Sequence, residues 1–144
     1  MFILLDPTCT PTKATEFSSC VDLYARVGMP ILKGHTACVP LGIQLDRPYM
    51  RDHLGQNFMR SHSFELKCRS SLPLKKNLMV ANGVGEIDLD FPDEICILLH
   101  NVGQETTCVE KGERIAQMKL VPHKGFLMGF DSLKVRTGGF GSTD

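Results

Sequence analysis

Residues 136–144, Arg-Thr-Gly-Gly-Phe-Gly-Ser-Thr-Asp, combine glycines and hydroxyl side chains with a single aromatic ring, Phe140. Glycine lets the backbone turn its amide groups toward an anion, and hydroxyl groups add hydrogen-bond donors. The ring of Phe140 offers a flat apolar surface. This set of residues suits a flexible arm that closes over a ligand with a phosphate chain and a planar base, and a frayed polar terminus is the alternative.

Four other segments, all earlier in the chain, also carry clusters of polar residues. They are Cys-Val-Asp-Leu-Tyr-Ala at 20–25, Cys-Arg-Ser-Ser-Leu at 68–72, Gly-Glu-Ile-Asp-Leu-Asp-Phe at 85–91 and Gly-Glu-Arg-Ile-Ala-Gln at 112–117. Together with the C-terminal segment they resemble the five motifs of the trimeric dUTP diphosphatases, the dUTPases. The resemblance runs from about residue 18 to residue 144.

This resemblance implies a fold, an activity and an assembly. The implied fold is all-β, a distorted jelly roll or β-sandwich barrel with a flexible glycine-rich C-terminal arm. The implied reaction is the Mg²⁺-dependent hydrolysis of dUTP at the α-phosphate to dUMP and pyrophosphate. It would limit uracil incorporation into DNA and supply dUMP for thymidylate synthesis. The implied assembly is a homotrimer whose sites combine several chains.

Asp88 is the candidate catalytic residue. Hydrolysis at the α-phosphate needs a water molecule held in line and a base that orients or deprotonates it. A positioned carboxylate supplies such a base. Asp88 stands where the family's third motif has the aspartate that activates the water. The alternative is that Asp88 and Asp90 are acids of a hairpin turn that stabilise their own backbone.

The same hairpin supplies the candidate residues for the base and the sugar. By the resemblance, Phe91 replaces the usual tyrosine and packs on the deoxyribose, which leaves no room for a 2′-hydroxyl. Asn82 would read the uracil edge with its amide donor and acceptor, although Asn82-Gly83 also fits a tight turn. Gly85 and Ile87, from the same motif, are counted with the substrate-binding residues.

The other motifs supply candidate residues for the phosphates. Arg69, Ser70 and Ser71 belong to the second motif, where serine would donate to the α- and β-phosphates. Arginine there would add charge or clamp a neighbouring carboxylate. Gln117 would donate its amide from the fourth motif, in which Arg114 is expected to be a structural ion-pair partner.

In the arm, Phe140 would stack on uracil. The residues expected to contact the β- and γ-phosphates are Arg136, Gly138, Gly139, Gly141, Ser142 and Thr143. Arg136 lies one residue closer to the glycines than the family arginine commonly does, which puts its γ-phosphate contact in question.

Asp22, in the first motif, is the candidate metal residue. Mg²⁺ commonly keeps its water ligands and binds mainly through substrate phosphates. We therefore expect Asp22 to hold the water shell of the ion and not the ion itself. Cys20 and Cys68 stand where the first and second motifs usually have glycine and proline.

Bulk properties limit the class of protein. A chain of 144 residues fits one domain, which we assign to residues 1–135, followed by the arm at 136–144. The 16 basic and 16 acidic residues balance, which argues against a nucleic-acid partner. No apolar run is long enough for a membrane partner. The cysteines are scattered along the chain, which argues against a zinc site and predicts buried or half-buried thiols. Free thiols indicate a reducing cytoplasm, which would be the cytoplasm of the host cell if the chain is viral.

Alternating apolar residues predict short strands. The alternation is clearest at 21–27, 64–69 and 116–120, whereas 95–99 is apolar throughout, as in a strand covered on both faces. Residues 47–63 form a polar insertion that does not show this alternating strand pattern. We expect a plain surface excursion with up to one helical turn, and a loop that binds a protein partner is the alternative.

Three other functions compete with dUTP hydrolysis. A deaminase of the same fold would act on dCTP and release ammonia. A regulatory protein would bind dUTP and act on a protein partner through residues 47–63. A structural jelly roll would keep the motifs without activity, which the joint presence of Asp88, Ser70, Gln117 and Phe140 argues against.

Overall fold

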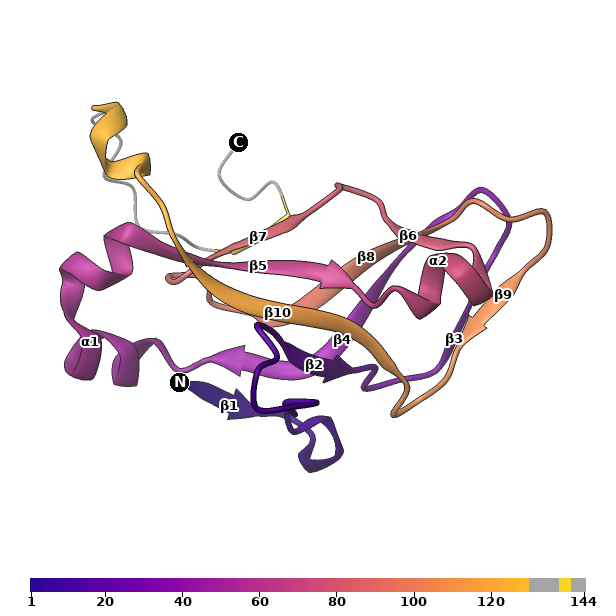
Figure 1. Ribbon diagram of the computed structural model, residues 1–144, viewed down its shortest axis with the longest axis horizontal. Coiled ribbons are helices and arrows are strands. Elements are labelled where there is room, and N and C mark those ends of the chain that lie inside the picture. The colour runs from indigo at the N-terminus through magenta and orange to yellow at the C-terminus, as the bar shows by residue number, and fades with distance from the viewer. Residues whose placement is uncertain (130–137, 141–144) are drawn as a thin grey trace.

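The protein, described as a computed structural model over residues 1–129 and 138–140, is built mainly from antiparallel strands (Figure 1). One sheet has the strand order β1-β4-β8-β6 and the other has the order β2-β10-β5-β7. The strands of the first sheet are β1 Phe2–Leu4, β4 Thr36–Leu45, β6 Leu78–Val80 and β8 Glu94–Asn101. Those of the second are β2 Val21–Tyr24, β5 His62–Cys68, β7 Gly85–Asp88 and β10 Arg114–Pro122. A two-stranded ribbon pairs β3 Met29–Ile31 with β9 Thr107–Val109.

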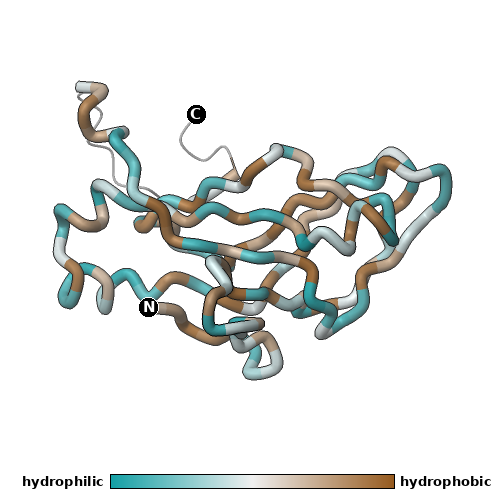
Figure 2. The backbone as a smooth tube through the Cα atoms, viewed as in Figure 1, coloured by the Kyte–Doolittle hydropathy of each residue, from teal (hydrophilic) through white to brown (hydrophobic). Residues whose placement is uncertain are grey.

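The core lies between the two four-stranded sheets. Leu23 and Leu66 of one sheet and Val39 and Ile97 of the other are at most 2% exposed and belong to a single buried cluster. Apolar and polar residues alternate along β2 and β5, as the sequence pattern predicts, whereas residues 95–99 of β8 are all apolar (Figure 2). The all-β sandwich predicted from the sequence is confirmed.

Strand β8 is fully buried on only one face within a single chain, so the predicted cover of its second face by a neighbouring subunit stays a prediction. Ile95, Ile97 and Leu99 are buried, whereas Cys96 and Leu98 are only half-buried within one chain. The second face of β8 is therefore available to form part of a pocket.

The insertion at 47–63 is helical, so the expectation of an excursion with up to one turn is wrong. Helix α1 runs from Arg47 to Ser61 and breaks at Gly55, where φ is 81° (Figure 1). The Asp46 carboxylate accepts a hydrogen bond from the Tyr49 amide at 3.1 Å, and the buried Met50 holds the first turns against the core. The capping aspartate followed by a proline was the sequence signal for this helix.

Three shorter helical segments complete the described chain. Helix α2 spans Ser71–Lys76, and the 3₁₀ turns η1 and η2 span Pro7–Cys9 and Gly125–Met128. Helix α2 was not predicted, and it ends at Asn77 in the left-handed conformation. In the part of the chain that the structure covers, no helix is both long and apolar enough to cross a membrane.

Strands β7 and β8 do not form the predicted hairpin. β7 pairs with β5, with Ser63 opposite Asp88, whereas β8 pairs with β4 and β6 in the other sheet. The segment that carries Asp88 and Phe91 therefore crosses from one sheet to the other. Strands β7 and β8, which it connects, diverge and leave space between them.

An ion pair ties the two sheets together near a bulge in β4. Arg26, which follows β2, donates from Nε and Nη2 to the Glu94 carboxylate of β8 at 2.8 and 2.7 Å. The Gly42 amide donates to Glu94 Oε1 at 2.8 Å. Gly42 has φ of 68°, and a Cβ built on it would lie 2.6 Å from the Cys9 Cβ.

We expect Gly42→Ala to destabilise the fold more than Gly34→Ala. Both glycines have positive φ, 68° and 71°, but a Cβ at Gly34 meets no atom within 4 Å. The left-handed conformation alone costs about 1 kcal/mol for alanine. The clash with Cys9 adds a further loss of about 1–3 kcal/mol at Gly42. Urea unfolding of both variants measures the difference, and equal losses would contradict the role of the Cys9 contact.

Candidate functional site

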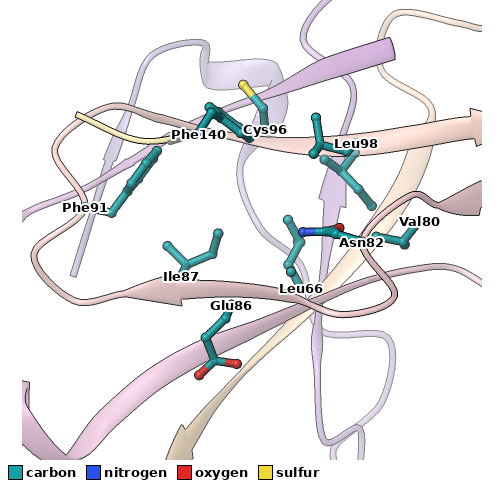
Figure 3. Close-up of a pocket in the computed structure, with 11 residues that line it drawn as sticks. Leu66, Val80, Asn82, Glu86, Ile87, Phe91, Cys96, Leu98 and Phe140 are labelled. Atoms are coloured by element: carbon teal, nitrogen blue, oxygen red, sulfur yellow. The ribbon is translucent and has the colours of Figure 1, made fainter. Parts of the chain in front are cut away.

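A pocket of about 210 Å³ opens where β7 and β8 separate (Figure 3). We call it the aromatic pocket, because the rings of Phe91 and Phe140 line it. The predicted substrate-binding residues that it contains are Asn82, Gly85, Ile87, Phe91 and Phe140. The structure therefore brings these five residues together around one pocket, and their role in substrate binding stays a prediction.

Residues of the C-terminal arm lie on the ring of Phe91. The rings of Phe91 and Phe140 meet edge to face with centroids 6.4 Å apart. Any Cβ on Gly139 would overlap the Phe91 ring, so glycine is required for this close approach. Phe91 is 6% exposed and Phe140 is 65% exposed, which leaves the Phe140 ring free to meet a ligand.

Asn82 lies in a turn and also lines the aromatic pocket, and its contact with a uracil edge stays a prediction. The Gly83 amide donates to the Val80 carbonyl at 3.2 Å and closes a turn over residues 80–83, between β6 and β7, in which Asn82 is a central residue and Gly83, with φ of 75°, is the last. The Asn82 side chain also lines the aromatic pocket (Figure 3). Its amide can supply both a donor and an acceptor to a planar base.

Sequence reasoning missed Cys96 and Leu98 as residues of the aromatic pocket. Both lie on the half-buried face of β8. Burial, with the nearby Cys38 as a smaller cause, raises the pKa of the Cys96 thiol to about 12, so the thiol is neutral in the pocket wall. The continuous apolar run at 95–99 was the signal that this second face contacts something.

All six cysteines are free thiols. Cys9 is buried, and Cys20, Cys68 and Cys96 are half-buried. Cys38 and Cys108 are exposed, so the expectation of buried or half-buried thiols is wrong for these two. Both lie on strands, in which successive side chains point to opposite faces of the sheet, and the side chains of Cys38 and Cys108 are on the exposed face.

A second pocket, of about 290 Å³, contains the residues expected to bind phosphates and metal. We call it the polar pocket. Its predicted members are Asp22, Arg69, Ser70 and Gln117. Strand pairing places Gln117 of β10 directly opposite Asp22 of β2 and beside Cys68 of β5, whose carbonyl accepts from Gln117 Nε2 at 3.5 Å.

The carboxylate of Asp22 organises the polar pocket. Its Oδ2 accepts from Arg69 Nη1 in a short ion pair and from Arg114 Nη1 at 3.4 Å. The predicted clamp by Arg69 and the predicted structural role of Arg114 are thus both found. Asp22 is 7% exposed, and these two arginines compensate the loss of water around its charge.

The geometry of Asp22 is compatible with a water-mediated metal contact. Both ion pairs use Oδ2, and Oδ1 makes no hydrogen bond to the described residues. In residues 1–129 and 138–140, no cluster of three or more His, Cys, Asp or Glu side chains could hold a metal ion alone. An ion held mainly by phosphate oxygens and water, with Asp22 in contact with that water, fits this donor set.

Within residues 1–129 and 138–140, the predicted site residues are divided between separate pockets. The aromatic and polar pockets share no lining residue, and Asp88, exposed at the end of β7, lines neither of them. Ser71 lines a neighbouring basic pocket with Arg69, Lys75 and Arg114. Of the arm, Gly138 is half-buried, and Arg136, Gly141, Ser142 and Thr143 lie outside the described residues.

Comparison with known proteins identifies the family. A model of the dUTPase family matches residues 58–144. The deoxyuridine 5'-triphosphate nucleotidohydrolase of Rickettsia akari (strain Hartford) is 35% identical over 139 residues, which cover 92% of this chain and 86% of the relative. The chain belongs to the dUTPase family. The corresponding protein of Chlamydia felis (strain Fe/C-56) is 36% identical over 114 residues, 78% of this chain and 70% of the relative.

Solved dUTPase structures share the fold of this family member. The dUTPase from Streptococcus mutans superposes with a TM-score of 0.71 at 25% identity, covering 85% of this chain and 95% of that chain. The dUTPase from phage phi11 of S. aureus gives a TM-score of 0.68 at 14% identity, covering 99% and 97%. The jelly-roll arrangement predicted from the dUTPase motifs is therefore confirmed.

We expect Asp22→Ala to destabilise this dUTPase family member by about 1–3 kcal/mol, because it leaves Arg69 and Arg114 without their shared carboxylate. Arg114→Ala should cost less than about 1 kcal/mol, since the Arg114 side chain is 50% exposed and its ion pair is the longer one. Urea unfolding measures both losses. An equal loss in the two variants would show that Asp22 does not hold the pocket together.

Proposed function

We propose that this protein hydrolyses dUTP to dUMP and pyrophosphate. The observation that carries the proposal is the presence of two complementary half-sites. The aromatic pocket offers rings and an amide for a base and sugar, and the polar pocket offers cationic and amide donors for phosphates. The curated relatives are named for this reaction, and a dUTPase of Staphylococcus bacteriophage 80alpha has been solved with dUpNHpp.

In the proposed reaction Asp88 orients a water molecule and accepts its proton as the water attacks the α-phosphorus. The bond from that phosphorus to the oxygen bridging the β-phosphate breaks, and pyrophosphate leaves. Arg69, Ser70 and Gln117 donate hydrogen bonds to the phosphates, where negative charge develops. Phe91 lies against the deoxyribose and excludes a 2′-hydroxyl.

The arm and the metal complete the proposed site. We assign residues 136–144 as the arm that closes on the substrate and residues 1–135 as the domain that binds it. The contact of Gly139 and Phe140 with Phe91 supports this division. Mg²⁺ would neutralise phosphate charge, with Asp22 holding its water; a phage phi11 dUTPase structure describes a structural Mg(II) ion.

We further propose a homotrimer in which each site combines half-sites of different chains. The separation of the two pockets within one chain supports this arrangement. Consecutive exposed apolar side chains at Phe126, Leu127 and Met128, 52–69% exposed, supply a surface for contact with another chain. The six free thiols are in keeping with the cytoplasm as the proposed compartment. A protein partner at 47–63 stays a prediction.

We expect Asp88→Asn to lower kcat for dUTP by about 10²–10⁴-fold, because the amide cannot accept a proton. KM should change little, since Asp88 acts on the water. Pyrophosphate release from dUTP measures the effect, with UTP, dTTP and dCTP as alternative substrates. The matched control is Asp93→Asn, an exposed acid on the same segment.

Three outcomes would contradict this proposal in whole or in part. Release of ammonia from dCTP would assign the protein to deamination. Binding of dUTP without pyrophosphate release by the unchanged protein would show a regulatory role. Equal loss of activity in Asp88→Asn and Asp93→Asn would remove Asp88 from the base role.

Mixing two inactive variants tests the sharing of sites between chains. Asp88→Asn removes the proposed base, which lies next to Ile87 of the aromatic pocket, and Gln117→Ala removes a donor of the polar pocket, so each homotrimer should lose most of its activity. If the half-sites come from different chains, unfolding and refolding the two together should restore about a quarter of wild-type activity, since random assembly joins two intact halves at that frequency. No recovery in the refolded mixture, with full recovery of refolded wild type, would place each site within one chain.

A further inference from the structure

Helix α1 contributes most of the lining of a third pocket, which contains three arginines and one acidic residue. The pocket has a volume of about 350 Å³ and is lined by residues from both halves of α1 and from the segment after β7. We call it the arginine pocket. The residues that line it are Arg47, Pro48, Arg51, Gln56, Met59, Arg60 and Asp90.

The break at Gly55 explains why three arginines share one cavity. Arg47 and Arg51 are four residues apart and lie on one face of the first half of α1. Gly55, with φ of 81° and ψ of 163°, turns the chain so that Gln56 and Arg60 of the second half face the same space. A continuous straight helix would separate these side chains along its length.

Most of the positive charge in the arginine pocket is not neutralised within the described chain. Arg47 Nη1 donates to the Asp90 backbone carbonyl at 3.3 Å. Arg51 and Arg60 make no ion pair or hydrogen bond with residues 1–129 or 138–140, and both are exposed. Asp90 is the sole acidic residue among those that line the cavity. In contrast, Arg26, Arg69 and Arg114 all pair with carboxylates.

We propose that the arginine pocket binds a polyphosphate anion, the group shared by inorganic pyrophosphate and the tails of nucleoside triphosphates. A planar guanidinium donates two parallel hydrogen bonds to phosphate oxygens, and three arginines line this pocket. The Gln56 amide adds a further donor. An anion also relieves the mutual repulsion of the arginines, which is stronger at a partly enclosed surface than in water.

The size and location of the pocket favour a small anion. The cationic surface is confined to one cavity on a chain whose total charge is balanced, whereas a nucleic-acid polymer needs an extended basic surface. The arginine pocket shares no lining residue with the aromatic pocket or the polar pocket, and none of the predicted substrate-binding residues that the structure describes lines it. Asp90 lies two residues beyond Asp88, so an anion that draws Arg47 away from the Asp90 carbonyl acts directly on the segment that carries the proposed base.

Hydrogen exchange of the full-length protein with and without inorganic pyrophosphate tests the proposal. Pyrophosphate should protect backbone amides within residues 47–61. The double variant Arg51→Gln/Arg60→Gln should lose this protection and bind pyrophosphate about tenfold or more weakly at this site by calorimetry, because two charged donors are removed. The matched control is Arg69→Gln, which damages the polar pocket and should leave the protection of 47–61 unchanged.

One further ligand, dTTP, distinguishes inorganic pyrophosphate from a nucleoside triphosphate as the source of the anion. Protection by dTTP at concentrations similar to those of pyrophosphate shows that the phosphate tail alone is recognised, and much tighter binding of dTTP assigns the pocket to a nucleotide. The single variants Arg51→Gln and Arg60→Gln keep the test informative if the double variant loses the helix.

Three results would overturn the proposal. One is unchanged exchange of residues 47–61 at saturating pyrophosphate. Another is identical binding by wild type and the folded double variant. The third is protection by an acidic peptide or an oligonucleotide but not by pyrophosphate, which would assign the surface to a macromolecular partner. None of these results depends on whether dUTP is hydrolysed.

Discussion

The ion pairs of one buried carboxylate, Asp22, hold three of the five motifs together. Asp22 lies on β2, Arg69 follows β5 and Arg114 begins β10, so a single oxygen links three strands of one sheet. A carboxylate that is 7% exposed must be compensated, and the two arginines do this while presenting their remaining donors to the polar pocket. The same contact therefore stabilises the sheet and fixes the position of the proposed phosphate-binding groups.

The aromatic pocket depends on a different constraint, the crossing of the chain between two sheets. Because β7 pairs with β5 and β8 pairs with β4 and β6, the strands on either side of Phe91 separate instead of closing as a hairpin. The pocket wall then includes the outward face of β8, and the glycine at 139 lets the arm approach the Phe91 ring. The ion pair of Arg26 with Glu94 ties the two sheets together at the start of β8.

Helix α1 shows how an insertion can add a binding surface without disturbing the fold. Its first turns are fixed by the Asp46 cap and by the buried Met50, so its polar face is free to carry charge. The break at Gly55 converts that face from a linear array into a cavity. A surface insertion costs little in chain entropy, whereas three arginines around one cavity cost electrostatic energy that an anion offsets.

The sequence by itself determined the fold class, the family and the chemical types of the site residues, because these depend on local patterns. Alternation of apolar residues gives strands, and the strings around Asp88, Ser70 and Gln117 give the motifs. Only the tertiary structure decided which residues meet: that Asp22 is shared by two arginines, that β7 and β8 belong to different sheets, and that Cys96 lines a pocket. It also showed that residues 47–61 are helical with clustered arginines. These features arise from pairing and packing between residues far apart in the chain, which no local pattern records.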